Sequence, residues 1–298
     1  YMSDRLEIAR EDIEKIFSEG PVVLTEAAVR ETLKRHRAYW RLSARETYHL
    51  FVSFMLEKTP LRRVHIELPR RTINGYTWGK QPFMETLLKL VSGSYFSHYT
   101  AMRLHGLTEQ VPKTLYLSRE KLRLDTRTDR QSGVTQADLD ANFSKPARLS
   151  GNQADVLEEG VRLMLLEAID HHGEGITDGR VNLGGRRPLQ LRYTSLERTM
   201  IDCVIRPPYA GGVFEIAKAF EHARGRLSVN RMNSLYRKMQ LYYPYHQAIG
   251  YYLERSGYRP SAIDLFRAWP MEHDFYLAND MRETDYIERW RLYVPKGF

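Results

Sequence analysis

The residues that point most directly to a chemical task are the basic side chains between Arg30 and Lys80. This stretch holds twelve lysines and arginines against four glutamates, a local balance of +8 that equals the formal net charge of the whole 298-residue chain. The rest of the chain is therefore neutral. Charge gathered on one short block favours a polyanionic partner such as duplex DNA. The twelve cations are Arg30, Lys34, Arg35, Arg37, Arg41, Arg45, Lys58, Arg62, Arg63, Arg70, Arg71 and Lys80.

Two helices are expected to carry part of this charge. Thr25 has the position of an N-cap for a helix at 26–36. Ser43 and Glu46 have the spacing of a capping box, which predicts a second helix over 44–57. Thr59-Pro60 ends this second helix, because the residue before a proline is disfavoured in the α conformation.

A basic hairpin is expected after the second helix. Residues 64–68 read as a strand, and residues 76–78 are the expected return strand. The Asn74-Gly75 pair between them is typical of a tight reversal, so we place the turn there.

Helix, short connection, capped helix and basic hairpin follow one another in the order of a winged helix-turn-helix. In that fold the second helix enters the major groove by its N-terminal end, where base pairs are distinguishable. We therefore expect base contacts from Arg45, Tyr48 and His49, with Ser43 at the helix start. Phosphate contacts are expected from Arg35, Arg37, Arg41, Arg62, Arg63, Arg70, Arg71 and Lys80.

The length predicts two domains, 1–80 and 81–298, and the larger one is expected to be α+β and rich in helix. Helices in it are expected at 83–91, 97–106, 157–168, 195–205, 213–224, 230–240, 246–256 and 262–268. Strands are expected at 113–118, 188–193, 274–277 and 291–294. A second capping box, at 194–197, accounts for Glu197.

Motifs for catalysis are weak in this chain. The sequence has no Gly-rich phosphate loop, no G-x-S-x-G elbow and no H-E-x-x-H pair. His98 and His105 lie seven residues apart on one expected helix face, and Asp202 is a candidate for a polar task in the interior. A structural role is favoured for the two histidines, since no third ligand is near in sequence. We predict no enzyme activity, no metal and no cofactor.

The single cysteine, Cys203, lies in an apolar run and is expected to be a buried hydrophobe. It excludes an intrachain disulfide, which fits a reducing compartment. No apolar run approaches the length that spans a bilayer. The sequence therefore predicts a cytoplasmic protein with no membrane partner.

Several blocks of the chain resemble the AbiEi antitoxins of the AbiE toxin–antitoxin systems of bacteria and archaea. The resemblance covers most of the chain and rests on the order of the blocks. They are Ser97–Thr108 with Pro112–Leu117, Thr194–Asp202 with Arg206–Val213, and Tyr243–Ala248 followed by Phe275–Leu277 and Trp290–Pro295.

The resemblance implies a winged-helix domain that represses its own operon by binding inverted repeats in the promoter. It also implies a C-terminal domain that counters a nucleotidyltransferase toxin encoded beside it, without a stable complex between the two proteins. Two alternatives stay open: a nuclease delivered by a basic domain, or a module that binds the toxin directly. A monomer and a dimer are both compatible with an inverted repeat.

Overall fold

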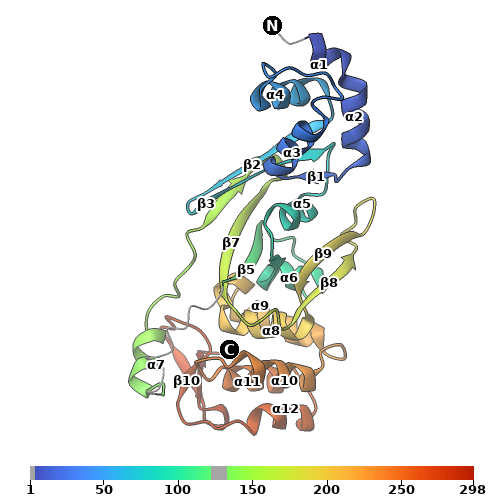
Figure 1. Cartoon of the computed structure of the whole chain (residues 1–298). Helices are drawn as coiled ribbons and strands as arrows, with labels where there is room; N and C mark the ends of the chain where they lie inside the picture. Colours follow the sequence, from blue (N-terminus) through green and yellow to red (C-terminus); the bar gives the residue numbers. More distant parts are fainter. Residues whose placement is uncertain (1–3, 122–132) are drawn as a thin grey trace. The chain divides into compact units, whose positions relative to one another are not determined.

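The structure, a computed structural model, describes residues 4–121 and 133–298 (Figure 1). The described residues form a mixed α+β fold with twelve α-helices and three sheets. The chain divides into two compact units, an N-terminal unit Tyr1–Gly93 and a C-terminal unit Ser94–Phe298. The boundary expected at residue 80 precedes one further helix, α5 (Phe83–Leu90), which belongs to the N-terminal unit.

The N-terminal unit consists of helices around one small antiparallel sheet with strand order β1-β3-β2. Its core is formed by apolar side chains from the helices and from the sheet, including Phe17, Trp40, Phe51 and Leu61. Before α5 the elements are α1 (Asp4–Ile8), α2 (Arg10–Glu19), β1 (Val23–Leu24), α3 (Glu26–His36), α4 (Tyr48–Lys58), β2 (Leu61–Leu68) and β3 (Arg71–Trp78).

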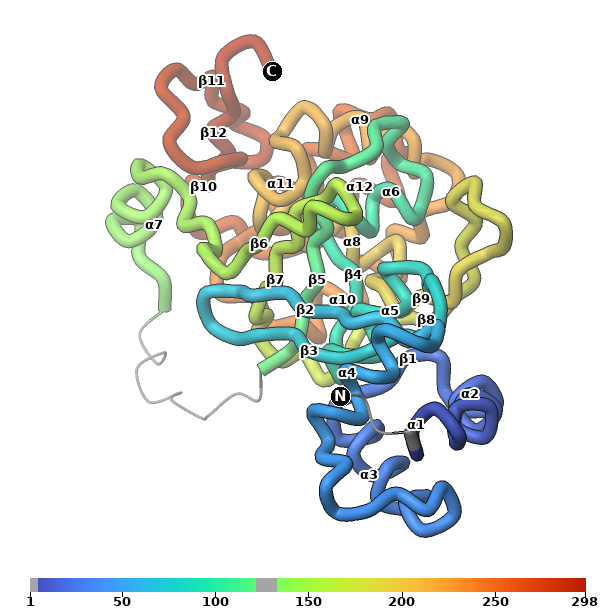
Figure 2. Tube along the Cα trace, turned by 90° about the horizontal axis from the view of Figure 1, so that it is seen from above, coloured from blue at the N-terminus to red at the C-terminus, as the bar shows by residue number. Residues whose placement is uncertain are grey.

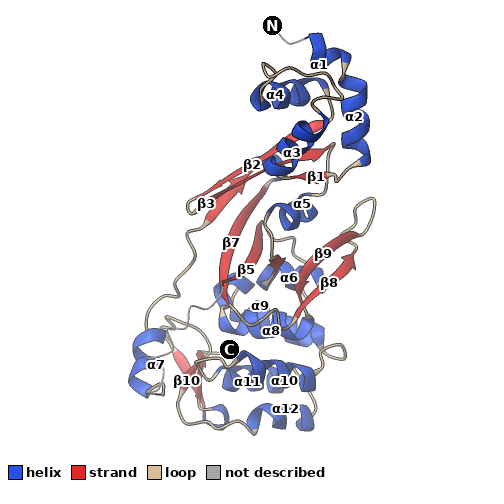
Figure 3. Ribbon diagram, in the orientation of Figure 1, coloured by secondary structure: helices blue, strands red, loops and turns tan. Residues whose placement is uncertain are grey.

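Helix α3 matches its prediction, and the Thr25 side chain caps it by accepting from the backbone N–H of Ala28. The hairpin turn does not match. Leu68 pairs with Arg71, so Pro69-Arg70 forms the two-residue turn, and Asn74 and Gly75 lie inside β3 opposite His65 and Val64. The long paired strands β2 and β3 are drawn in red in Figure 3.

Gly75 is needed for packing and not for a turn. A Cβ at this position would lie 2.3 Å from Cδ2 of Leu90 on α5 and 2.9 Å from the backbone oxygen of Leu24 on β1. The missing side chain lets α5 and β1 approach β3 closely. This tertiary contact explains why a turn-like dipeptide occurs within a strand.

The C-terminal unit is built on a six-stranded mixed sheet of order β6-β7-β5-β4-β9-β8, which runs across the view in Figure 2. Pairs β7·β5 and β4·β9 are parallel and the other three pairs are antiparallel. The strands are β4 (Ser94–Phe96), β5 (Thr114–Lys121), β6 (Gln153–Val156), β7 (Val161–Ile169), β8 (Ile176–Val181) and β9 (Leu189–Thr194).

Strand β7 occupies the segment for which the sequence predicted a helix over 157–168, and that prediction is wrong. Leu163 to Leu166 are four consecutive buried residues, and β7 pairs with β6 on one side and β5 on the other. An interior strand is covered on both faces, so its apolar residues form a continuous run that does not alternate. Such a run also contains apolar residues at helical spacing, and the helix was predicted from that spacing.

Helices pack beside this sheet around the largest apolar core, which includes Met200, Phe220, Tyr252 and Phe266. The helices predicted from 195 to 268 are all present, with small shifts at their ends, as α8 (Leu196–Ile205), α9 (Val213–Ala223), α10 (Val229–Met239), α11 (Tyr245–Arg255) and α12 (Pro260–Arg267). The helix predicted at 97–106 is α6 (His98–Leu104), and α7 (Gln136–Phe143) lies in a segment for which the sequence predicted no helix. Cys203 on α8 is fully buried, as expected, and burial raises the pKa of its thiol.

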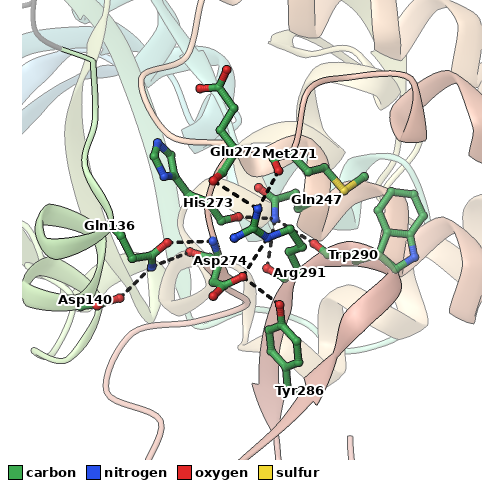
Figure 4. A network of polar contacts seen from close by, with 10 residues as sticks. All are labelled: Gln136, Asp140, Gln247, Met271, Glu272, His273, Asp274, Tyr286, Trp290 and Arg291. Carbon is green, nitrogen blue, oxygen red and sulfur yellow. Dashed lines mark hydrogen bonds and ion pairs between the residues drawn. The ribbon is translucent and has the colours of Figure 1, made fainter.

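A third, small sheet of order β10-β12-β11 closes the C-terminal unit, formed by β10 (Phe275–Tyr276), β11 (Thr284–Ile287) and β12 (Leu292–Pro295). Figure 4 shows the polar network that fixes it. Asp274 accepts from Arg291 at 2.9 Å and from Tyr286 at 2.8 Å, and its backbone exchanges hydrogen bonds with the amide of Gln136 on α7. The network connects α7 with the residues just before β10 and β12, segments that lie far apart in the sequence.

Candidate nucleic-acid interface

The start of α4 differs from its prediction. Thr47, and not Ser43, is the N-cap: its hydroxyl accepts from the backbone N–H of Leu50. Ser43 instead donates to the carboxylate of Glu46 at 2.5 Å, in the turn before the helix. Because Glu46 is buried and bonded within this turn, the chain enters the helix only at Tyr48. Arg45 therefore lies in the turn, two residues before the cap.

Arg37 holds this turn together. Its guanidinium donates to the backbone oxygens of Ser43 and Glu46, the latter at 3.0 Å. A side chain that satisfies two loop carbonyls positions the backbone before α4. Arg37 was predicted to contact phosphate, and the structure gives it this positioning contact.

Tyr48 is also a positioning residue in this structure. It is half-buried, the guanidinium of Arg30 lies 3.7 Å from its ring centroid, and its hydroxyl is 3.3 Å from that of Tyr76 on β3. Burial and the contact with Tyr76 raise the pKa of the Tyr48 hydroxyl, so it stays neutral. Tyr48 thus connects α3, α4 and β3, while its neighbour His49 is exposed.

The hairpin has one buried face and one polar face. Strand alternation and the observed register place Arg63, His65 and Asn74 on the same face as Tyr76. Of these, Arg63, His65 and Asn74 are exposed. The opposite face carries the buried side chains of Ile66, Leu68 and Ile73.

The predicted phosphate contacts differ in how far their charge is already compensated. Arg35 lies 3.5 Å from Glu31 along α3. Arg45, Arg62 and Arg63 are exposed, and none of them forms an ion pair with any residue of the described ranges. These three therefore present uncompensated positive charge around the start of α4 and along β2.

The remaining predicted contacts lie on the same unit. Arg41 is exposed and follows Trp40 with a left-handed φ of 53°. Arg70 is exposed in the hairpin turn, Arg71 is half-buried at the start of β3, and Lys80 is exposed just after β3. The structure thus brings charges from the two sides of the hairpin and from the turn before α4 into one compact unit.

A cleft of about 330 Å³ lies between α4 and the hairpin. Polar side chains from four elements, α3, α4, β2 and β3, line it. The lining residues are Glu26, Tyr48, His49, Val52, Ser53, Arg63, Val64, His65, Asn74, Gly75 and Tyr76. The sequence interpretation placed Asn74 in the hairpin turn and gave His65 no binding role, although the alternation Arg63, His65, Glu67 already places three ionisable side chains on one strand face.

The polar residues predicted for the C-terminal unit lie in its interior. His98 is buried, with a left-handed φ of 50°, and its Nδ1 is 2.8 Å from the hydroxyl of Ser97. His105 is hydrogen-bonded through Nε2 to the backbone oxygen of Thr194 at 2.8 Å. The two histidines therefore contact different groups.

Asp202 is paired inside α8. It accepts from Nε of Arg198 at 2.8 Å, and both residues are buried. Nη1 of Arg198 donates to the backbone oxygen of Glu174 at 2.6 Å and lies 3.7 Å from the carboxylate of Glu120 on β5. Burial opposes the charge of Arg198, but the two carboxylates raise its pKa above the ordinary value. Arg198 was not identified from the sequence.

Glu197 does not complete the predicted capping box. Ser195 caps α8 by accepting from the N–H of Arg198. The carboxylate of Glu197 accepts instead from the N–H of Ser228, at the start of α10, and pairs with Arg231 at 3.1 Å. The residue that suggested a local cap connects two helices.

We expect the C-terminal unit to lose stability in mild acid. Burial lowers the pKa of His98 and of His246 to about 4, against about 6.5 in an unfolded chain. Below pH 6.5 these two histidines are protonated in the unfolded chain but stay neutral in the folded unit. The free energy of unfolding should therefore fall with decreasing pH, by about 1.4 kcal/mol per pH unit for each histidine. Urea titrations between pH 7 and 5 measure this slope, and a free energy independent of pH over that range would contradict it.

Within residues 4–121 and 133–298, no three His, Cys, Asp or Glu side chains gather as a metal site would require. None of the described helices combines the length and the apolar composition that crossing a bilayer demands.

Comparison with solved structures finds the crystal structure of the RV2827C protein from Mycobacterium tuberculosis. The TM-score is 0.58 at 13% identity, over 98% of this chain and 92% of that chain. At this identity the similarity concerns the fold alone, and it extends through both units. No family model and no curated protein matches the chain.

Proposed function

We propose that the N-terminal unit is a winged helix-turn-helix that binds duplex DNA, with α4 as recognition helix and β2–β3 as wing. The observation that carries this proposal is the element order α2, β1, α3, α4, β2, β3, combined with uncompensated cations beside α4 and along the hairpin. Together they favour a phosphate backbone as partner.

The parts of the interface have different tasks in this proposal. Arg45 and His49, on either side of the α4 N-terminus, face base edges in the major groove. Arg62, Arg63, Arg70 and Arg71 contact phosphates from the wing, and Arg35, Arg41 and Lys80 add to the positive field. Tyr48 and Arg37 act indirectly, because their contacts fix the position of α4 and of the turn before it.

We further propose that the chain is the antitoxin of a toxin–antitoxin system of the abortive-infection type. In this role it binds inverted repeats in its own promoter as an autorepressor, and its C-terminal unit counters a nucleotidyltransferase toxin encoded alongside, without a stable complex. The support is the resemblance of several C-terminal blocks to AbiEi antitoxins. The chain then acts in the cytoplasm and performs no catalysis of its own.

Gel-shift titration of fragments from the chain's own promoter tests the DNA half. Replacing Arg45 with alanine should weaken the operator complex by roughly 1–3 kcal/mol and relax selectivity at one base pair. The double variant R70Q/R71Q should weaken binding to every duplex and lower the slope of log affinity against log salt by about two.

A matched control removes two charges at a distance from the proposed interface. Arg10 and Lys15 lie on α2, an element that is not part of the proposed interface. Because R10Q/K15Q also removes two positive charges, it has the same net charge as R70Q/R71Q. This control should keep the wild-type salt slope. Equal slopes in all three proteins, or no preference of the wild type for promoter fragments, would refute the interface.

Co-expression tests the antitoxin half. Induction of the neighbouring nucleotidyltransferase gene should arrest growth, and the full chain supplied on a second plasmid should restore it. R70Q/R71Q should restore growth equally well, because the wing serves DNA binding and not toxin neutralisation. Arrest that persists with the full chain present would exclude this toxin as its target.

A further inference from the structure

Leu50 is the apolar residue of α4 that the fold leaves in contact with solvent. Six apolar residues occupy positions 50 to 56, and five of them pack in or against the core of the N-terminal unit. Leu50 is the sixth: its relative exposure is 53%, and it does not belong to that core. Packing within the unit therefore does not explain why this position carries a leucine.

A single exposed leucine is common on protein surfaces, so the position of this one decides its meaning. Leu50 is the third residue of α4, and its backbone N–H donates to the Thr47 side chain at 3.3 Å. This cap fixes the first turn of the helix. His49, beside Leu50, and Ser53, three residues on and on the same side of the helix, are exposed too. Leu50 is thus an apolar group among polar side chains, at the end of the helix that is proposed to enter DNA.

The charge of the unit identifies the class of partner. Arg45 before α4, and Arg62 and Arg63 on β2, are exposed and form no ion pair within the described residues. A protein that docked here through Leu50 would need a larger apolar surface than one side chain offers. One apolar group on a cationic surface is instead suited to the floor of a DNA groove, between two phosphate strands.

Thymine supplies the apolar group of the major groove, its C5 methyl. The remaining groups that distinguish base pairs in this groove are hydrogen-bond donors and acceptors. Leucine has no polar atom, so against any of them it would exclude water without replacing the lost hydrogen bond, which costs free energy. Against the thymine methyl it buries apolar surface on both sides. An exposed leucine in the major groove therefore favours thymine and disfavours the other bases.

We propose that Leu50 determines specificity for a thymine in the operator by packing against its C5 methyl group. The inference rests on the proposed function, because it assigns a base to a helix that is taken to lie in the major groove. Arg45 and His49 then form hydrogen bonds to neighbouring base edges, and Leu50 adds an apolar contact. An inverted repeat presents the same base twice, so both half-sites should contain this thymine.

Single replacements of thymine by deoxyuridine test the contact, because deoxyuridine pairs like thymine and lacks only the methyl group. Each thymine of the operator fragment is replaced in turn, and the affinity of the full chain is measured by gel shift. One position in each half-site should weaken the complex by about three- to tenfold, as expected when one buried methyl group is lost. Replacements elsewhere should have smaller effects.

The variant L50A assigns that loss to Leu50. It should bind the thymine operator more weakly than the wild type by a similar factor, and deoxyuridine at the sensitive position should cause no further loss. Such coupling excludes a general effect of deoxyuridine on DNA shape. I8A is the matched control: it removes an aliphatic side chain with 68% exposure from α1, and it should keep both the affinity and the deoxyuridine penalty. Thermal unfolding of both variants should match the wild type, since both side chains are exposed.

The outcomes separate this inference from the proposed function. Operator binding that tolerates deoxyuridine at every thymine, or a penalty that persists undiminished in L50A, overturns the role of Leu50 and leaves DNA binding in place. A wild type with no preference for promoter fragments refutes the proposed function, and the role of Leu50 falls with it.

Discussion

Replacing Arg198 with methionine is expected to lower the free energy of unfolding of the C-terminal unit by about 3–5 kcal/mol. Arg198 has 2% of its side chain exposed and is the partner of two carboxylates, those of Asp202 at 2.8 Å and Glu120 at 3.7 Å. Methionine fills similar volume, so the loss reports electrostatics more than a cavity. It leaves negative charge in a buried setting with no counterion.

Urea unfolding of the full chain measures this loss. Lys296 provides the control, because it also pairs with a glutamate, Glu283, but 66% of its own side chain and 72% of its partner's are exposed. K296M should change the free energy by no more than about 1 kcal/mol, as exposed ion pairs do. The double variant R198M/D202N should recover part of the loss, since it removes one of the stranded charges. An R198M protein as stable as the wild type would mean that water reaches these carboxylates.

Replacing Gly75 with alanine is expected to destabilise the N-terminal unit by roughly 1–3 kcal/mol and to weaken DNA binding with it. The added methyl group would sit 2.3 Å from Leu90 Cδ2, which can move, and 2.9 Å from the backbone oxygen of Leu24, which moves only with β1. Relief therefore requires β3 to shift away from β1 and α5. Because β3 carries Asn74 and Tyr76, such a shift also disturbs the cleft.

A double-mutant cycle separates the two contacts. L90A alone removes a leucine side chain from α5. In G75A/L90A the added methyl group no longer meets the Leu90 side chain, so the loss of stability in the double variant should be smaller than the sum of the losses in the two single variants. The contact with the Leu24 oxygen persists in the double variant, and the rescue should stay incomplete. Thermal unfolding measures all three proteins. G151A, at a glycine with open space and no left-handed φ, is the control and should leave stability unchanged. Additive effects of G75A and L90A would contradict the packing explanation.

Local signals in the sequence predicted the elements that depend on local chemistry. Helix α3 was found from Thr25 and its apolar spacing, and α8 to α12 were found because each has an amphipathic or apolar face bounded by clear breakers. The charge of the 30–80 block needed no structure at all, because net charge is a sum over residues. The mixed α+β class followed from the same local patterns.

Predictions failed where a distant segment decides the local structure. Ser43 and Glu46 have capping-box spacing, but Arg37 and burial of Glu46 hold them in a turn, and Thr47 caps the helix. Asn74-Gly75 has the composition of a reversal, but Leu90 and Leu24 require a glycine inside the strand. Glu197 bonds to Ser228 on the next helix instead of its own N-terminus.

The sequence by itself thus determined how much charge the N-terminal unit carries and which helices form. Only the tertiary structure decided which cations stay uncompensated, which of them hold the backbone, and that His65, Asn74 and Arg63 line one cleft with α4. The physical reason is that composition and periodicity act over a few residues. Burial, ion pairing and cleft formation depend instead on groups that come together only when the chain folds.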